Sequence, residues 1–392
     1  MHARRPLAAV ARPRLSWRRN RVGRRTRRSP GVREDEADDG RDDVATDSEL
    51  QGMAQAFALA CTPGVPTGPN PRVGAVVIDD TGQVVAEGYH RGAGTAHAEV
   101  VALAAAGDSA RGSTVVVSLE PCNHTGRTGP CTEALIEAGV RRVVFAQDDL
   151  NPVADGGAEA LRAAGIDVEG GVLADEAETI NQVWTFVLRH RRPYVTWKFA
   201  ITLDGRSAAA DGSARWISGP EARADVHRQR SVCDTVLVGT GTVEADDPQL
   251  TVRDESGLPW PRARQPLRAV MGMRDLPSSA RVCDDAAETI RLPTHDPAVA
   301  LAALYAQDRQ HVFLEGGPTL AAAFVRAGLV DEVVAYVAPA LLGAGIAGVG
   351  DLGITSIEGI SRLELLEAIR IGDDVRLTMR PLRGPDDEAV RS

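Results

Sequence analysis

The fold and chemistry of this chain are set by residues 97–131, which read HAEVVALAAAGDSARGSTVVVSLEPCNHTGRTGPC. The stretch opens on a histidine with a glutamate two residues later, and it closes on two cysteines. Between them, the β-branched run 113–119 predicts a buried strand. The alanine-rich residues after His97 and the segment 131–139, which ends in glycine, both predict helices. We therefore expect His97 and Cys131 at helix starts and Cys122 after a strand.

These residue types are those of a catalytic zinc site. Zinc in such a site takes three protein ligands and leaves one position for water. His97, Cys122 and Cys131 are the predicted ligands, because a nearby helix start favours the thiolate that zinc binds. Glu99 would close the open position as a fourth ligand, so we predict that it carries protons in catalysis. Nucleobase deaminases share this signature, although two residues usually separate their cysteines and eight do here.

A second interpretation of the same residues needs no metal. A histidine can cap a helix, and a free cysteine is most often a buried apolar residue. The four residues occur together, with a strand and two helices around them, and this favours the zinc site.

Composition indicates two domains in a reducing compartment. A chain of 392 residues exceeds what one hydrophobic core usually serves. No apolar run reaches 18 residues, so we expect no membrane span. Five cysteines do not form a disulfide framework in a chain this long, and Cys61, Cys233 and Cys283 are expected to be packed or incidental. We expect a cytoplasmic protein.

Charge is distributed unevenly along the chain. Residues 1–33 contain twelve arginines and no acid, so the formal net charge of −10 becomes −22 for the remainder. A body this acidic argues against nucleic acid as the main partner. We predict that residues 1–46 form a disordered N-terminal extension. An RNA-binding arm, a transit peptide and a segment without function all remain open for it.

The rest of the chain predicts two α/β units that meet near Arg191–Pro193. The first is expected to contain helices at 48–60, 158–164 and 176–190, a hairpin of 75–78 with 84–88, and strands at 142–146 and 166–168. The second is expected to contain helices at 221–230 and 319–327, strands at 195–200, 235–239, 268–271, 290–292, 311–314 and 331–337, and a final hairpin of 363–369 with 374–379. Ser218 is the expected cap of the helix that starts near Pro220.

Two features of the second unit are candidates for ligand binding. Gly316-Gly317-Pro318 follows a strand and precedes a helix, as in an anion cradle, although the same residues also suit a plain turn. Trp216 is a candidate for stacking on a planar ring, with a core position as the alternative.

Taken together, these residues resemble the bifunctional riboflavin biosynthesis deaminase/reductases over about residues 50–385. The first half carries the family pattern in Asn70-Pro71, Val73-Gly74, His97-Ala98-Glu99, Pro121–Cys131, Asp149 and Asn151-Pro152. The second half carries it in Lys198, Ala200, Leu203-Asp204-Gly205, Trp216-Ile217, Thr242-Val243, Asp246-Asp247-Pro248, Leu250, Arg253 and Leu314–Thr319. The eight-residue cysteine spacing, with its Gly-Arg-Thr, is specific to this family among the deaminases.

The resemblance implies an α/β protein with two domains. A cytidine-deaminase-like α/β/α domain at 47–192, around a mainly parallel sheet, precedes a dihydrofolate-reductase-like α/β domain at 193–385. It implies that a diaminopyrimidinone ribosylamine 5′-phosphate loses its ring amine to water with the help of Zn²⁺, and that NADPH then reduces the ribosyl group to ribityl. We expect this small phosphorylated pyrimidine as the partner, neither nucleic acid nor a membrane, and a homo-oligomer.

The resemblance also implies the site residues, by position. The deaminase substrate would be held by Asn70, His90, Arg127, Asp149 and Asn151. NADPH would be contacted by Ala200, Trp216, Thr242, Asp246, Gly317, Pro318, Thr319, Leu320, Ala321, Ala322 and Ala323. The reductase substrate would be held by Arg230, Leu250, Arg253 and Glu315, where two arginines suit a phosphate. Ala214 and Met273 depart from the family, which has serine at or near both positions.

Two other functions remain to be weighed. The arginine-rich extension suggests a tRNA adenosine deaminase, but that enzyme would have cysteines two residues apart and no use for residues 193–385. Ala214, together with Gly129, Gly157 and Ala158, which depart from the family's usual loop residues, suggests a binding protein whose catalytic sites have decayed. The presence of all four zinc-site residues speaks against the latter.

Overall fold

The computed structural model describes residues 45–65, 68–124, 129–151 and 156–382. The predicted extension lies outside the described residues as far as residue 44, and so does the candidate substrate contact Arg127. Helix α1 begins at Asp47, where Thr46 caps it through a reciprocal pair of hydrogen bonds with Glu49. Within the described ranges, none of the helices combines the length and apolar character that a membrane crossing requires.

In the described part of the first half, five strands form one sheet in the order β2-β1-β3-β4-β5. Their bounds are β1 Gly74–Ile78, β2 Val84–Tyr89, β3 Thr114–Leu119, β4 Arg142–Gln147 and β5 Asp167–Glu169. β1 pairs antiparallel with β2 and β3, while β3, β4 and β5 are parallel. The sheet is therefore mixed, and the expectation of a mainly parallel sheet holds only for β3 to β5.

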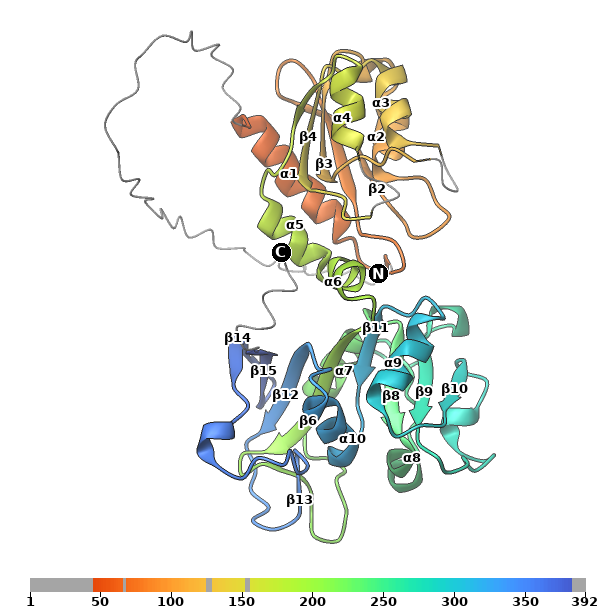
Figure 1. Cartoon of the computed structure of the whole chain (residues 1–392), viewed down its shortest axis with the longest axis vertical. Coiled ribbons are helices and arrows are strands. Elements are labelled where there is room, and N and C mark those ends of the chain that lie inside the picture. The colour runs from red at the N-terminus through yellow and green to blue at the C-terminus, as the bar shows by residue number, and fades with distance from the viewer. Residues whose placement is uncertain (1–44, 66–67, 125–128, 152–155, 383–392) are drawn as a thin grey trace, which may run out of the picture. The chain divides into compact units, whose positions relative to one another are not determined.

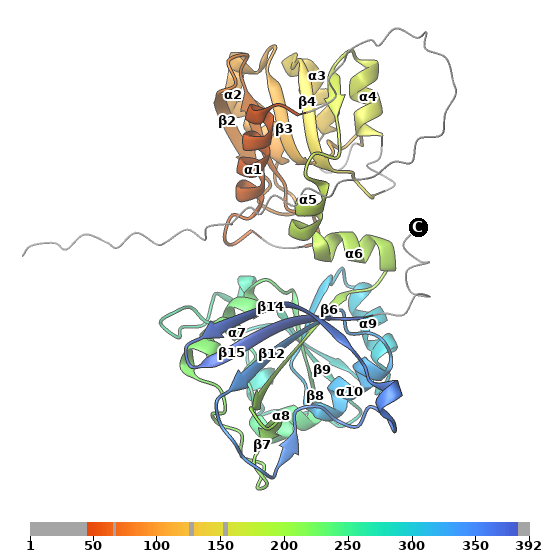
Figure 2. The same ribbon diagram turned by 90° about the vertical axis from the view of Figure 1, so that its left-hand side faces the viewer.

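Helices cover both faces of this sheet and make three layers (Figure 1, Figure 2). The helices are α1 Asp47–Ala60, α2 Ala98–Ala106, α3 Cys131–Ala138, α4 Gly157–Ala163, α5 Ala174–Ile180 and α6 Gln182–His190. α1 and α5 share one core cluster with Val76 and Val116, whereas α2, α3 and α4 share another with Val77 and Phe145. Strands β1 and β3 are buried on both faces, which explains why both read as unbroken apolar runs.

The single helix predicted over 176–190 is wrong, because α5 and α6 are separated at Asn181. The buried side chain of Asn181 pairs with the backbone of one residue, Arg72. The Arg72 N–H donates to Asn181 Oδ1 at 2.8 Å, and Asn181 Nδ2 donates to the Arg72 carbonyl at 3.1 Å. An asparagine side chain that bonds to backbone groups competes with regular helix geometry. Here the two bonds connect the break between α5 and α6 to a loop that lies 109 residues earlier in the chain.

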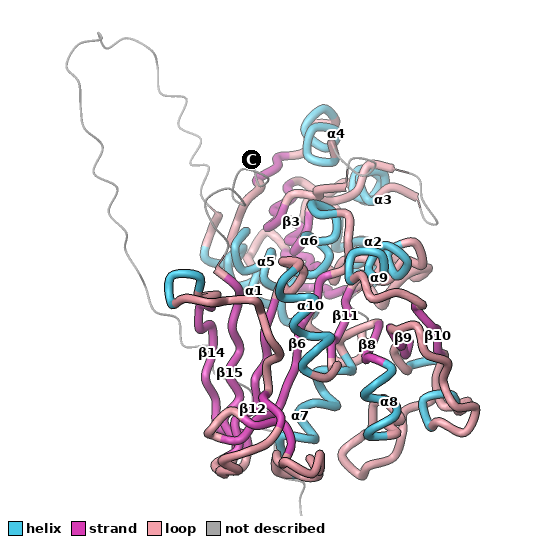
Figure 3. The backbone as a smooth tube through the Cα atoms, turned by 60° about the horizontal axis from the view of Figure 1, so that its bottom comes forward, coloured by secondary structure: helices cyan, strands magenta, loops and turns pink. Residues whose placement is uncertain are grey.

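The described strands of the second half form an eight-stranded sheet in the order β10-β9-β8-β11-β6-β12-β15-β14 (Figure 3). Their bounds are β6 Tyr194–Thr202, β8 Thr235–Gly239, β9 Leu267–Met271, β10 Thr289–Leu292, β11 His311–Leu314, β12 Glu332–Ala338, β14 Leu363–Ile371 and β15 Asp374–Pro381. The pairs from β10 to β12 are parallel, and β15 pairs antiparallel with β12 and β14. Strands β7 (Arg206–Ala208) and β13 (Ile346–Ala347) pair separately.

Helices cover both faces of this sheet as well. They are α7 Pro220–Ser231, α8 Thr240–Asp246, α9 Pro297–Tyr305 and α10 Pro318–Arg326. The 3₁₀ turns among the described residues of both halves are Gly107–Ala110, Arg262–Arg264, Arg281–Cys283 and Ile357–Gly359. α9 and α10 pack on one face, and α7 and α8 on the other. The predicted cap Ser218 is wrong, because Gly219 caps α7 and its N–H donates to Asp374 Oδ2 at 2.7 Å.

Candidate active sites

Three predicted metal ligands converge beside the first sheet. The ligand atoms of His97, Cys122 and Cys131 all lie within 4.8 Å of one another. His97 Nδ1 is 3.2 Å from Cys131 Sγ and 3.5 Å from Cys122 Sγ. His97 precedes α2 as its N-cap, Cys131 is the first residue of α3, and Cys122 follows β3. The strand and the two helices predicted around these residues are the elements that hold them.

The chemistry of this donor set fits zinc. The Cys131 thiol donates to Cys122 and thereby lowers the pKa of Cys122 to about 4. The same contact, together with burial, raises the pKa of Cys131. One imidazole and two sulfur donors at these separations match the ligands that Zn²⁺ takes when a fourth position stays open. The alternative in which the cysteines are only buried apolar residues leaves their contact with the imidazole unexplained.

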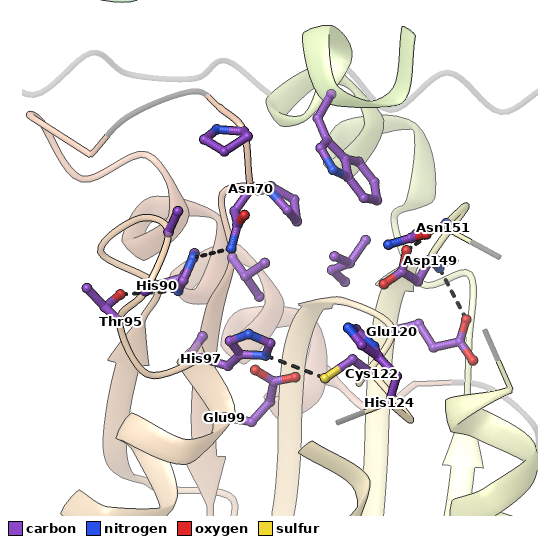
Figure 4. Close-up of a pocket in the computed structure, with 18 residues that line it drawn as sticks. Asn70, His90, Thr95, His97, Glu99, Glu120, Cys122, His124, Asp149 and Asn151 are labelled. Atoms are coloured by element: carbon purple, nitrogen blue, oxygen red, sulfur yellow. Dashed lines mark hydrogen bonds between the residues drawn. The ribbon is translucent and has the colours of Figure 1, made fainter. Parts of the chain in front are cut away.

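Glu99 lies in the first turn of α2, beside His97 and Cys122 (Figure 4). Its side chain is buried, and burial raises the pKa of its carboxyl group. The Glu99 carboxyl group lies at the same cavity as the predicted metal ligands, but it is not part of the ligand cluster.

A cavity of about 330 Å³ lies over the cluster and is lined by four predicted substrate residues, Asn70, His90, Asp149 and Asn151. Asn70 Nδ2 is 3.2 Å from His90 Nε2 (Figure 4). Burial lowers the pKa of His90. Burial, together with the charges of Glu120 and Cys122, raises the pKa of Asp149 to about 6. These residues bring amide, imidazole and carboxyl groups to the wall of the cavity.

The sequence analysis assigned no role to Thr95, Glu120, His124 and Trp184, which line the same cavity. His124 could have been found, because it lies two residues after the ligand Cys122. Trp184 could not, because it reaches the cavity from α6 and no local pattern marks it.

In the second half, Glu315 follows β11 and is the centre of a buried charge cluster. Arg230 donates to Glu315 through both Nε and Nη2, the latter at 3.0 Å, and Lys198 Nζ lies 3.7 Å from Glu315 Oε2. Burial alone would raise the pKa of Glu315, but Arg230 and Lys198 hold it below its ordinary value. Burial lowers the pKa of Lys198. The structure thus joins Arg230 and Glu315, two predicted contacts of the reductase substrate.

Arg253 differs from Arg230 in its partners. It donates to Gln249 Oε1 at 2.6 Å and to the Gly257 carbonyl at 2.9 Å. Within the described ranges, none of the ion pairs includes Arg253. Leu250 is buried, with a φ of 57°.

Of the predicted cofactor residues, the structure brings Thr242 and Gly317 together, at the glycine turn before α10. The Gly317 N–H donates to Thr242 Oγ1 at 3.1 Å, which joins this turn to α8. Trp216 is 69% exposed, with the Arg223 guanidinium 4.5 Å from its ring centre, so a core position is excluded. The remaining predicted cofactor residues differ in their exposure. Asp246 and Thr319 are exposed, and Ala200, Leu320 and Ala323 are half-buried. Ala321 and Ala322 are buried, and Pro318 is the first residue of α10.

Two family models match the chain. "Cytidine and deoxycytidylate deaminase zinc-binding region" matches residues 46–147, and "RibD C-terminal domain" matches residues 193–377. The riboflavin biosynthesis protein RibD of Mycobacterium tuberculosis is 50% identical over 314 residues, covering 80% of this chain and 91% of that protein. The chain belongs to the RibD family. RibD of Escherichia coli is 41% identical over 357 residues, covering 83% of this chain and 97% of that protein.

Solved structures of the RibD family agree with this assignment. RibD of Acinetobacter baumannii superposes with a TM-score of 0.79 at 38% identity, covering 86% of this chain and 99% of that one. A diaminohydroxyphosphoribosylaminopyrimidine deaminase/5-amino-6-(5-phosphoribosylamino)uracil reductase of Thermotoga maritima gives 0.76 at 32% identity, with the same coverage of 86% and 99%.

The chain is therefore a RibD-family deaminase and reductase of riboflavin biosynthesis, with zinc and NADPH as its cofactors. The predicted fold class, a cytidine-deaminase-like α/β/α domain followed by a dihydrofolate-reductase-like α/β domain, is confirmed. The tRNA adenosine deaminase alternative is wrong, because it has no place for the reductase domain at 193–377. The domain limits 47–192 and 193–385 stay a prediction.

Proposed function

We propose that the first half hydrolyses the ring amine of 2,5-diamino-6-ribosylamino-4(3H)-pyrimidinone 5′-phosphate. The second half then reduces the ribosyl group, giving 5-amino-6-ribitylaminouracil 5′-phosphate. The observation that carries the deaminase proposal is the convergence of His97, Cys122 and Cys131 with Glu99 beneath one cavity.

In the proposed deamination, His97, Cys122 and Cys131 would hold zinc, and the chemistry that zinc would supply is the activation of water as a nucleophile. Glu99 accepts a proton from the attacking water and delivers it to the departing amine, which leaves as ammonia. Burial of Glu99 excludes bulk water from this transfer.

Residues of the cavity wall would orient the ring and sugar. We assign the polar contacts to Asn70, His90, Asp149 and Asn151, which come from three loops, before β1, after β2 and after β4, and face one space (Figure 4). Arg127, proposed for the same substrate, lies outside the described residues. A polar site of this kind selects its substrate because a wrong partner leaves buried groups unpaired.

In the proposed reduction, NADPH supplies a hydride. Gly317 and the first turn of α10 would hold it, together with Thr242, Asp246, Trp216 and Ala200, and Thr242 already fixes the turn through Gly317. The backbone of Ala321 and Ala322, whose side chains are buried, would complete this contact.

The phosphate of the reductase substrate is assigned to Arg253. The guanidinium of Arg230 is held by Glu315, so Arg230 is better suited to order the sugar end of the site, together with Leu250. Arg253 keeps its charge without a carboxylate partner among the described residues. A charge-assisted bond to phosphate is among the stronger contacts a protein can make.

Arg253→Ala is expected to raise the reductase KM for the phosphorylated substrate about 10- to 100-fold, because one charge-assisted contact is lost. The dephosphorylated substrate should be affected much less. Steady-state kinetics with both substrates measures the difference. Arg264→Ala is the matched control, because Arg264 stacks on Trp260 in the adjoining loop and is assigned no ligand. An equal loss with both substrates would refute the phosphate role.

We also propose a cytoplasmic homo-oligomer. None of the five cysteines, all of which lie within the described residues, forms a disulfide, and this suits a reducing compartment. Strand β14 is the last strand of its sheet, and Leu363, Leu365 and Leu366 on it are 39%, 58% and 46% exposed. An exposed apolar edge strand of this length is commonly covered by a partner. Light scattering of the intact chain gives its mass, and a monomer at micromolar concentration would contradict the proposal.

A further inference from the structure

Glu120 is a buried carboxylate for which the proposed mechanism has no role. Its residue is 7% exposed, and among the described residues it belongs to none of the ion pairs. Its two oxygens accept from backbone groups instead, from the Asp149 N–H at 3.2 Å and from the Ala158 N–H at 2.9 Å. Burying a charge without a cation is costly unless hydrogen bonds satisfy it. The two hydrogen bonds of Glu120 therefore compensate for its burial, and the backbone groups that they hold indicate its role.

The two bonds hold both ends of one segment. Asp149 stands at its beginning, and Ala158 lies in the first turn of α4 at its end. A Cβ added at Gly157 would lie 1.8 Å from the Pro121 carbonyl oxygen, so the start of α4 is packed directly against Pro121. Pro121 is followed by the metal ligand Cys122.

The segment also has internal order at its first end. The Asn151 N–H donates to Asp149 Oδ1 at 2.9 Å, so the two proposed substrate residues form one turn. Figure 4 shows the bond from Asp149 to Glu120 on the side of the cavity where Cys122 lies. Glu120 thus connects the turn that carries a metal ligand with the turn that carries two substrate contacts.

We propose that Glu120 is a positioning residue of the deaminase, which sets the distance between the metal-ligand turn and the Asp149–Asn151 turn. The inference rests on the proposed function, because it assumes that Asp149 and Asn151 contact the pyrimidine substrate. Glu120 lines the cavity, but both of its oxygens accept from backbone N–H groups, so in this account it contacts neither zinc nor the substrate. Its effect is to fix the substrate contacts before the substrate arrives, which spares the cost of ordering them on binding.

Glu120→Ala is expected to raise the deaminase KM about tenfold or more, with a smaller change in kcat, because two hydrogen bonds to a charged group are lost. Zinc content should stay at the wild-type level. Glu120→Gln should lie between wild type and Glu120→Ala, since its amide keeps one acceptor oxygen. Hydrogen exchange without substrate should become faster at 148–151 and 156–158 only.

Glu49→Gln is the matched control. Glu49 is another buried glutamate of the first half, but it caps α1 and pairs with Arg142, away from the cavity. Glu49→Gln should leave the deaminase KM and the hydrogen exchange of 148–151 and 156–158 unchanged. An unchanged KM in Glu120→Ala, or a loss of activity that follows loss of zinc, would overturn the proposal.

The failure of the two proposals can be told apart. Wild-type protein that does not deaminate the pyrimidine refutes the proposed function. Hydrogen exchange at 148–151 and 156–158 in Glu120→Ala, measured on the zinc-loaded protein, tests the positioning role of Glu120 independently of any turnover. If Asn151→Ala raises KM while Glu120→Ala changes neither KM nor exchange, only the positioning role is wrong.

Discussion

Glu99→Gln is expected to lower the deaminase kcat by about 10²- to 10⁴-fold, the range that positioned proton transfer supplies. The amide has nearly the size and polarity of the carboxyl group, so the buried pocket in the first turn of α2 should keep its packing. It cannot accept a proton from water and pass it to the amine. Zinc content should remain as in wild type, because Glu99 is not among the three ligands.

The reductase rate of the same variant is its internal control. With the deaminated pyrimidine supplied directly, Glu99→Gln should oxidise NADPH at the wild-type rate, since Glu99 contributes only to the first sheet's site. Single-turnover ammonia release measures the deaminase step by itself. Normal release by this variant would remove Glu99 from the mechanism.

Cys131→Ala is expected to abolish zinc retention and to lower ammonia release by more than about 10²-fold. Catalytic zinc needs three protein ligands, and the two that remain in this variant would bind the ion much more weakly. Cys131 is completely buried at the start of α3, and alanine removes only a sulfur atom from that position. Metal analysis of the dialysed variant, beside its ammonia assay, checks both expectations together.

Cys61→Ala is the matched control for the metal site. Cys61 is an exposed free thiol at the end of α1 and is not part of the cluster. It should keep zinc and full activity. If Cys131→Ala retained zinc, the cluster of one imidazole and two thiols would not be the site at which the metal is held.

The elements around the metal cluster could be predicted because their signals are local. The run that forms β3 is β-branched and fully buried, and Gly139 ends α3 in the left-handed conformation. A strand end and two helix starts are enough to bring His97 and Cys131 together with Cys122. The same local signals identified β8 and β11 in the second half.

The errors arose where a distant partner decides the local structure. Nothing near Asn181 shows that its amide pairs with the backbone of Arg72, and this pairing divides the helix predicted over 176–190. Gly219 caps α7, and its N–H donates to Asp374, which lies 155 residues later in the sequence. Helix α9 is absent from the prediction for another reason. Its start does carry a local signal, an N-cap residue, Asp296, directly before Pro297.

The site was predicted in the same uneven way. His97, Glu99 and the two cysteines followed from spacing, whereas Glu120 and Trp184 became visible only when the cavity was in place. The family resemblance assigned Arg230 to the reductase substrate, but it could not show that Glu315 binds the Arg230 guanidinium. Charge alone therefore did not separate the arginine of an ion pair from the arginine available to a phosphate.

The most direct test of the account is zinc analysis of the intact wild-type chain combined with a two-stage assay. We predict about one zinc per chain, ammonia release from the diaminopyrimidinone ribosylamine 5′-phosphate, and then loss of NADPH absorbance that depends on that release. Tightly bound zinc with neither ammonia release nor NADPH oxidation would contradict the account and would favour a binding protein whose catalytic sites have decayed.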